Sequence, residues 1–182
     1  MKEAGRERTH TGRGRKGSAV PAAVAGGAGT LLLLVLVGMC LPLTVPRIFG
    51  YQIYSVVSGS MEPAIPVGSL LYIEPAEPEE VAEGDVIAFF GARDSASIIT
   101  HRVVENRVVM GEFITKGDAN QTEDMNPVPY ENLVGRVRYT LPRAGRLAEL
   151  LVSRRGKILA GGVIAAAVIL QLLSSVIRKW GT

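Results

Sequence analysis

The residues of this chain best suited to nucleophilic chemistry lie in the stretch Val57-Ser58-Gly59-Ser60-Met61-Glu62-Pro63. Two hydroxyl groups flank a glycine there, and apolar runs at 53–57 and 69–73 lie on either side. A serine on a tight turn between two strands holds its Oγ exposed, with backbone N–H groups nearby, which suits a nucleophile and its oxyanion donors. Gly/Ser turns are usually structural. A catalytic interpretation therefore needs a base and a group that orients the base.

The base has few candidates, because the chain contains two histidines, His10 and His101. His10 belongs to a basic N-terminal stretch, whereas His101 lies in the strand-like apolar run 98–104. A histidine on a half-buried strand can be a purely structural, hydrogen-bonded residue. His101 is, however, the one histidine of the central part of the chain, and a neutral imidazole can accept a serine proton and return it to a leaving amine. We predict His101 to be the base.

The group that orients His101 has two candidates in the polar stretch 116–124, namely Asp118 and Asp124. A carboxylate that accepts a hydrogen bond from the imidazole fixes its tautomer. Either aspartate could reach a neighbouring strand, and either could instead cap the backbone of its own loop. The residue types alone leave both possibilities open. Asp85, which follows Gly84, is interpreted as a turn residue.

Four motifs in this order resemble type I signal peptidases, and the resemblance covers residues 50–138. The motifs are Ser58-Gly59-Ser60-Met61-Glu62-Pro63, Gly84-Asp85-Val86-Ile87, His101-Arg102-Val103 and Lys116-Gly117-Asp118-Ala119-Asn120. The usual bacterial enzymes carry a lysine base where this chain has His101, so the chain resembles the archaeal and endoplasmic-reticulum-like (Ser–His) branch. Lys116 is the only lysine between residues 46 and 142 and belongs to the fourth motif. A Ser–Lys dyad, as in related self-cleaving repressors, is therefore disfavoured.

The resemblance implies a role for each matching residue. Ser60 matches the nucleophile, His101 the general base and Asp124 the third member, while Asp118 is the aspartate of the fourth motif. The oxyanion hole would use the backbone N–H of Ser60, with Ser58 as a second candidate donor. The implied activity is that of a serine endopeptidase (a hydrolase) that removes N-terminal signal peptides after small residues, without cofactor or metal. The alternative is a catalytically inactive, membrane-tethered β domain that binds extended peptides by strand addition.

The central part of the chain, residues 46–142, reads as a mainly β domain. Its apolar runs are short and separated by Gly, Pro and Asp turn signals, and no long amphipathic helical pattern occurs. We predict a compact antiparallel, barrel-like domain. Its expected strands cover residues 53–57, 69–73, 86–90, 98–104, 107–110, 113–115 and 133–139. The acidic stretch 74–83 between them is expected to be a solvated loop.

The N-terminal part predicts a membrane anchor. Residues 1–18 are basic and are expected to be a disordered cytoplasmic tail. Residues 19–45 contain no charge and are long enough for a transmembrane helix, with Pro42 and Pro46 expected to mark its end. A cleaved signal peptide has a similar start, but no small-x-small site follows the apolar run. Cys40 is the single cysteine, which excludes an intramolecular disulfide and a cysteine-based metal cluster.

The C-terminal part predicts an interfacial basic segment at 143–156, a second transmembrane helix at 157–177 and a short cytoplasmic tail at 178–182. Six basic residues precede the first span, whereas Arg47 alone follows it closely. The positive-inside rule then places the β domain outside the cytoplasm of a multi-pass plasma-membrane protein. The basic tail lacks interleaved aromatics, so nucleic acid is not expected as a partner. The expected partners are signal peptides and the lipid bilayer. The sequence does not say whether accessory subunits are needed.

Overall fold

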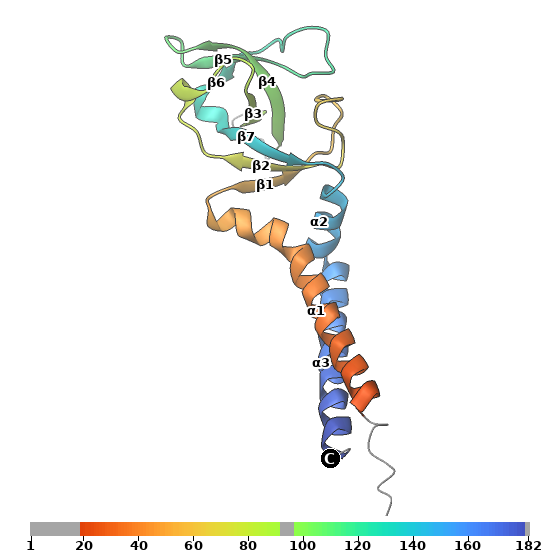
Figure 1. Ribbon diagram of the computed structural model, residues 1–182. Helices are drawn as coiled ribbons and strands as arrows, with labels where there is room; N and C mark the ends of the chain where they lie inside the picture. Colours follow the sequence, from red (N-terminus) through yellow and green to blue (C-terminus); the bar gives the residue numbers. More distant parts are fainter. Residues whose placement is uncertain (1–18, 92–96, 181–182) are drawn as a thin grey trace, which may run out of the picture. The chain divides into compact units, whose positions relative to one another are not determined.

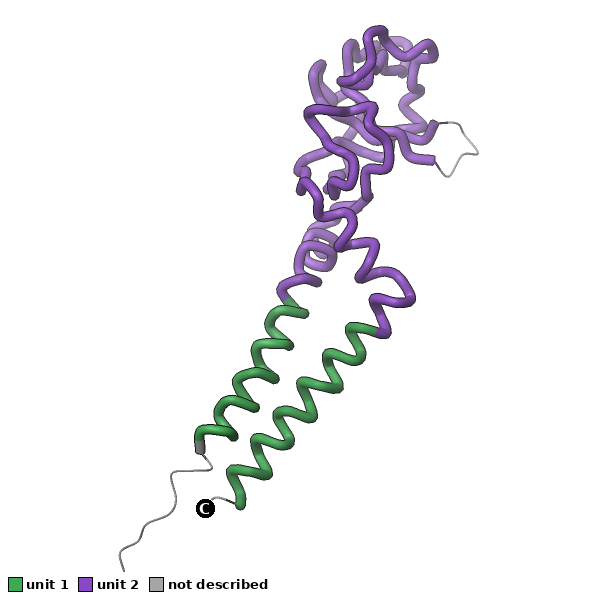
Figure 2. The backbone as a smooth tube through the Cα atoms, turned by 90° about the vertical axis from the view of Figure 1, so that its right-hand side faces the viewer, with its two compact units in different colours: residues 1–37, 159–182 green, residues 38–158 purple. Residues whose placement is uncertain are grey.

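The computed structural model describes residues 19–91 and 97–180, so the expected tail at 1–18 and the last two residues lie outside the described part. The chain forms two compact units, one made of Met1–Val37 and Leu159–Thr182 and the other of Gly38–Ile158 (Figure 2). The first unit holds most of two long helices, and the second holds the β domain with the adjoining helical ends.

Two helices, α1 (Ala19–Ile48) and α3 (Arg154–Trp180), are long and apolar enough to cross a membrane, by length and composition. Within the first unit the Ser174 hydroxyl of α3 donates a hydrogen bond of 2.7 Å to the Ala22 carbonyl of α1. The expectation that Pro42 and Pro46 mark the end of the first helix is wrong, because both lie inside α1. A proline removes one backbone donor but keeps a helical φ, and the Thr44 hydroxyl adds a hydrogen bond of 3.0 Å to the Cys40 carbonyl.

The second unit is built on one curled, seven-stranded antiparallel sheet that forms a half-barrel (Figure 1), which confirms the mainly β, barrel-like prediction. The sheet order is β1-β2-β7-β3-β4-β5-β6. The strands are β1 (Gln52–Ser55), β2 (Leu70–Glu74), β3 (Val86–Phe90), β4 (Ile98–Arg107), β5 (Glu112–Lys116), β6 (Val128–Pro129) and β7 (Leu133–Leu141). Two short 3₁₀ helices, η1 (Pro78–Glu80) and η2 (Tyr130–Asn132), and the helix α2 (Gly145–Val152) complete the unit.

Three details of the fold differ from the prediction. Of the expected strand at 107–110, Arg107 is the last residue of β4, and the other residues belong to the turn that joins β4 to β5, where the apolar Val109 is fully exposed. The stretch 74–83 contains η1 and anchors itself in the core through Val81, which is 3% exposed. The two-residue strand β6 was not expected, because so short a segment carries no alternating pattern.

Apolar side chains pack on both faces of the sheet, because successive residues of a strand point to opposite sides. One cluster holds Ile87 and Phe89 of β3 together with Val103 and Phe113. The other holds Ala88 of the same strand with Met61, Ile65, Leu71 and Ile73. Full burial of a valine, leucine, isoleucine, phenylalanine or methionine side chain contributes about 1.5–3 kcal/mol to the free energy of unfolding. The two clusters together fix the strands that surround the candidate site.

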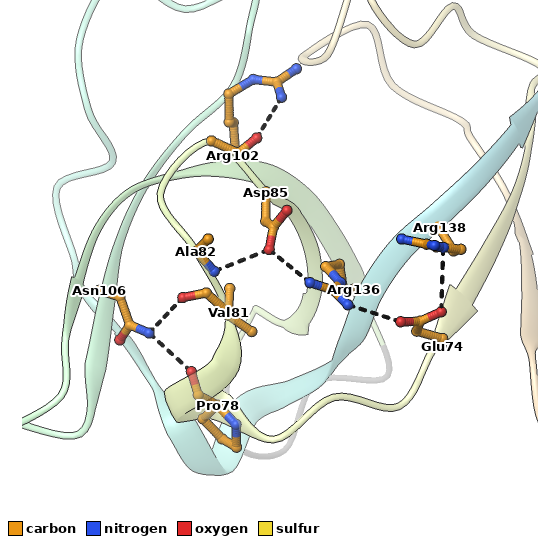
Figure 3. A network of polar contacts seen from close by, with 10 residues as sticks. Glu74, Pro78, Val81, Ala82, Asp85, Arg102, Asn106, Arg136 and Arg138 are labelled. Carbon is orange, nitrogen blue, oxygen red and sulfur yellow. Dashed lines mark hydrogen bonds and ion pairs between the residues drawn. The ribbon is translucent and has the colours of Figure 1, made fainter.

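A polar network joins β2, the start of β3 and β7 on the second unit (Figure 3). Arg136 lies 3.0 Å from a Glu74 oxygen and 3.2 Å from an Asp85 oxygen. Its hydrogen bonds to these carboxylates raise the pKa of Arg136 above its usual value. Asp85 also accepts a hydrogen bond of 3.0 Å from the Ala82 N–H. Asp85 therefore has the expected turn role and ties the turn to β7.

Candidate active site

Ser60 lies on the turn between β1 and β2, and the residues that follow it are anchored in the core. Met61 is 2% exposed and Ile65 is 5% exposed, and both belong to the cluster under this turn. The turn closes through a hydrogen bond of 3.0 Å from the Glu62 N–H to the Gly59 carbonyl and one of 2.8 Å from Ile65 to Met61. Burial of two large side chains thus holds a partly exposed serine in place.

His101 lies on β4, directly opposite Ile87 of β3, with 12% of its side chain exposed. The ring meets Phe89 edge to face at 6.2 Å between centroids. Its Nδ1 lies 2.5 Å from the Asp124 Oδ2. Because an ionised carboxylate only accepts hydrogen bonds, Nδ1 carries the proton and Nε2 of the neutral ring is left as a proton acceptor.

Asp124 is held by Thr115 of β5, a residue that the sequence analysis did not single out. The Thr115 hydroxyl donates a hydrogen bond of 2.7 Å to Asp124 Oδ2, the oxygen that also faces His101. The Asp124 N–H donates in turn to the Thr115 carbonyl at 2.8 Å. Thr115 is fully buried. A threonine in a strand is common, so the sequence offers no signal for this contact.

Asp118 pairs with Arg102, the residue next to His101 on β4. The guanidinium donates two hydrogen bonds to the carboxylate, at 2.8 Å from Nε and 2.6 Å from Nη2. This pairing raises the pKa of Arg102 above its usual value. A third hydrogen bond of 2.8 Å runs from Arg102 to the Gly84 carbonyl. Asp118 thus connects its loop to β4 and to the turn before β3.

Gly117 brings the Ser60 turn and His101 to one place. A Cβ atom at position 117 would lie 2.6 Å from the Ser60 carbonyl oxygen and 3.1 Å from His101 Nε2. The Ala119 N–H also donates a hydrogen bond of 2.9 Å to that carbonyl. The unprotonated ring nitrogen therefore faces the Ser60 side of the loop, and glycine allows the close approach.

Ser58 lies beside Ser60, with 3.4 Å between their hydroxyl oxygens. Ser58 is exposed, and Ser60 is partly buried. Both serines line one groove, whereas His101 and Asp124 line a neighbouring pocket, and Ile99 borders both. The close approach at Gly117 links His101 to the Ser60 turn, while Asp118 pairs with Arg102.

This groove, of about 410 Å³, runs between the end of β1 and the start of β4. One side is lined by residues 54–58 and the other by residues 97–100. Among the described strands, β1 pairs with β2 alone. Residues 98–101 of β4 pair with β3, and pairing with β5 begins at Arg102. Within the described strands, two strand edges that have no strand partner therefore border the groove, an arrangement that can accept an extended peptide.

The comparison with known proteins gave relatives of one kind, although no family model matches the chain. Signal peptidase I W of Bacillus subtilis is 42% identical over 99 residues, 52% of this chain and 50% of the relative. The signal peptidase complex catalytic subunit SEC11C of Homo sapiens is 33% identical over 107 residues, 53% of this chain and 55% of the relative. The SEC11 subunit of Komagataella phaffii is 30% identical over 115 residues, 55% of this chain and 66% of the relative.

The chain spans about half the length of the first two of these relatives and somewhat more of the third. The relatives include both a bacterial signal peptidase I and eukaryotic signal peptidase catalytic subunits. This agrees with the resemblance of the four motifs to the endoplasmic-reticulum-like branch. By sequence similarity, the chain is related to signal peptidase I and to the SEC11 catalytic subunits of signal peptidase complexes.

Proposed function

We propose that this chain is a membrane-anchored serine endopeptidase that removes N-terminal signal peptides from exported preproteins after small residues. One observation carries the proposal. The Nδ1 of His101 lies 2.5 Å from the Asp124 Oδ2. Its Nε2 lies beside Gly117, which also closely approaches the Ser60 carbonyl oxygen. The similarity to signal peptidases, which covers about half of the chain, supports the choice of substrate.

In this mechanism the Ser60 Oγ attacks the carbonyl carbon of the scissile peptide bond. His101 Nε2 accepts the Ser60 proton and passes it to the leaving amine as the C–N bond breaks. Water then attacks the acyl-enzyme, His101 accepts a proton from it, and Ser60 regains its proton as the signal peptide leaves. Asp124 positions the imidazole and stabilises the imidazolium that forms between these steps.

The substrate would bind as an extended segment in the groove between β1 and β4. Backbone N–H and C=O groups of these two strand edges would pair with its backbone. The oxyanion would meet the backbone N–H of Ser60, and the Ser58 hydroxyl, 3.4 Å from the Ser60 hydroxyl oxygen, would add a second donor. Loss of one such donor costs about 10²–10³ in turnover.

The two apolar helices would anchor the enzyme in the plasma membrane, with the β domain on the extracytoplasmic side. Signal peptides are themselves apolar segments delivered to the membrane, so anchoring enzyme and substrate in one surface raises their effective concentration. The six basic residues before α1, against Arg47 after its apolar part, support this orientation.

Cleavage of a purified preprotein in detergent tests the activity, with wild type, Ser60→Ala and His101→Ala compared. Thr140→Ala is a matched control, because it removes an exposed hydroxyl on β7. We expect both site variants to lose cleavage by about 10³-fold or more and the control to keep it. Wild-type turnover in either site variant would contradict the mechanism. Wild-type protein that binds the preprotein without cleaving it would favour the inactive peptide-binding domain instead.

Protease treatment of intact cells tests the orientation. The loop between β2 and β3 contains the exposed Glu79 and Glu80 and offers a cleavage site outside the barrel. We expect a protease specific for glutamate to cut the chain in intact cells. Cleavage only after lysis would place the β domain in the cytoplasm.

A further inference from the structure

One side of α2 carries a mixture of basic and apolar side chains that the mechanism does not use. Arg146, Leu147 and Leu150 are all exposed, Leu147 by 40% and Leu150 by 49%. At 100° per residue these positions lie opposite Gly145 and Ala148, which are buried. The helix therefore has an inner face against the β domain and an amphipathic outer face.

The first turn of α3 continues this outer surface with more positive charge. Arg154, Arg155 and Lys157 are exposed, and the turn contains no acidic residue. Between residues 143 and 157 the chain has five basic residues against one acidic residue, Glu149. Glu149 accepts a hydrogen bond of 3.1 Å from the Ser55 hydroxyl, so the surface has a strong excess of positive charge.

The inner face of α2 holds the strand that borders the groove (Figure 1). The Gly145 N–H donates a hydrogen bond of 2.8 Å to the Gly68 carbonyl. A Cβ atom at position 145 would lie 2.5 Å from the Ser55 Oγ, so glycine permits this close packing. Ser55 and the neighbouring Val56 line the groove with Ser60. The helix α2 therefore contacts one wall of the groove directly.

We propose that Arg146, Leu147, Leu150, Arg154, Arg155 and Lys157 form a docking surface for a bilayer that contains anionic phospholipids, and that this contact holds the groove wall at the membrane. We name these six residues the α2 surface. The inference rests on the proposed function in one respect, that α3 crosses the membrane.

Charge and chain continuity select this occupant. The apolar part of α3 follows Lys157 directly, so a bilayer that accepts α3 begins where the basic residues end. Arginine and lysine side chains bind phosphate headgroups while leucine side chains enter the acyl boundary. Each basic residue near an anionic surface strengthens binding by about fivefold. An acidic protein segment would use the charges but would not explain the exposed leucines beside a membrane helix.

Fluorescence quenching tests the contact without requiring activity. Trp180 is the only tryptophan, so Trp180→Phe/Leu150→Trp carries one reporter on the α2 surface. The full chain is reconstituted in phosphatidylcholine vesicles whose acyl chains carry bromine, with or without phosphatidylglycerol. We expect strong quenching that increases with phosphatidylglycerol. Trp180→Phe/Val109→Trp is the control, because Val109 is fully exposed at the β4–β5 turn, and it should stay unquenched.

Charge neutralisation tests the coupling to the groove. In wild type we expect the KM for a preprotein to rise several-fold when phosphatidylglycerol is omitted. The variant Arg146→Gln/Arg154→Gln/Arg155→Gln/Lys157→Gln should show one KM in both lipids. A matched variant with Arg6, Arg8, Arg13 and Arg15 changed to Gln should keep the wild-type response.

An unquenched reporter at position 150, or a lipid response that survives neutralisation of the α2 surface, would overturn the inference. Loss of the lipid response on neutralisation together with an unquenched reporter would mean that the charges act without contact between α2 and the bilayer, and would also overturn it. Cleavage by wild type in detergent, measured separately, shows whether the proposed function itself holds.

Discussion

The two aspartates of the loop after β5 serve two different faces of the sheet. His101 and Arg102 are consecutive on β4, so their side chains point to opposite sides. Asp124 pairs with His101, on the side where Val103 and Thr115 are buried. Asp118 pairs with Arg102 on the other side. Two carboxylates six residues apart thus join one strand through two different partners.

The His101–Asp124 and Arg102–Asp118 pairs differ in exposure to solvent and in the ability to transfer a proton. The His101–Asp124 pair is 12% and 23% exposed, and Thr115 supplies a further donor to the same carboxylate oxygen. A neutral ring held in this way can take up a proton and remain in place. The Arg102–Asp118 pair is 38% and 17% exposed, and an arginine stays charged throughout. The first pair suits proton transfer, and the second suits holding a loop.

Asp124→Asn should produce the largest effect. The neutral amide cannot stabilise the charged imidazolium, and its NH₂ group can donate to Nδ1 and favour the other tautomer of the ring. We expect kcat for a preprotein to fall by about 10³–10⁴-fold, with the thermal unfolding midpoint little changed. A larger fall in kcat for Asp118→Asn would reverse the assignment of the two aspartates.

Thr115→Val should have an intermediate effect on kcat. Valine keeps the shape and removes the hydroxyl that donates to Asp124 Oδ2, so one hydrogen bond to a charged group is lost. We expect kcat to fall by about tenfold, and Thr115→Ser, which keeps the hydroxyl, to restore most of it. Equal losses in both variants would show that Thr115 contributes packing alone.

Asp118→Asn should affect stability more than turnover. The change removes a two-bond ion pair that is partly exposed to solvent, and such pairs contribute about 1 kcal/mol. We expect the free energy of unfolding to fall by that amount and kcat to change by less than about threefold. A double-mutant cycle with Arg102→Gln should show coupling of the same size. Additive effects would mean that the ion pair does not stabilise the loop.

The difference between the two aspartates marks how far the sequence alone can predict the site. Ser60 and His101 could be singled out because one serine turn and one domain histidine offered few alternatives. The residue types left Asp118 and Asp124 open, and only the resemblance favoured Asp124. The choice depends on the strand register, in which Val103 faces Thr115 and Arg102 faces Lys116. Register is a long-range property that local patterns do not specify.

At the level of the fold, local patterns predicted the class of the domain and misplaced two details. Short apolar runs between turn signals predicted a β-rich, barrel-like domain, which the seven-stranded sheet confirms. The run at 107–110 predicts a separate strand, yet β4 ends at Arg107 and Gly111, with φ +69°, helps close a turn after it. The prolines at 42 and 46 predict the end of the helix, yet a proline keeps a helical φ and removes only its own backbone donor, and α1 continues to Ile48.

Lys116→Gln should have the smallest effect on kcat. It tests whether the residues on the Arg102 side of the sheet take no part in proton transfer. Lys116 lies opposite Arg102 in the β4–β5 register, and directly opposite residues share one face of a sheet. Its ammonium therefore belongs to the Arg102 side and not to the His101 side. We expect kcat to stay within about twofold of wild type in detergent at several pH values. A loss comparable with that of His101→Ala would make Lys116 the base and replace the Ser–His mechanism by a Ser–Lys dyad.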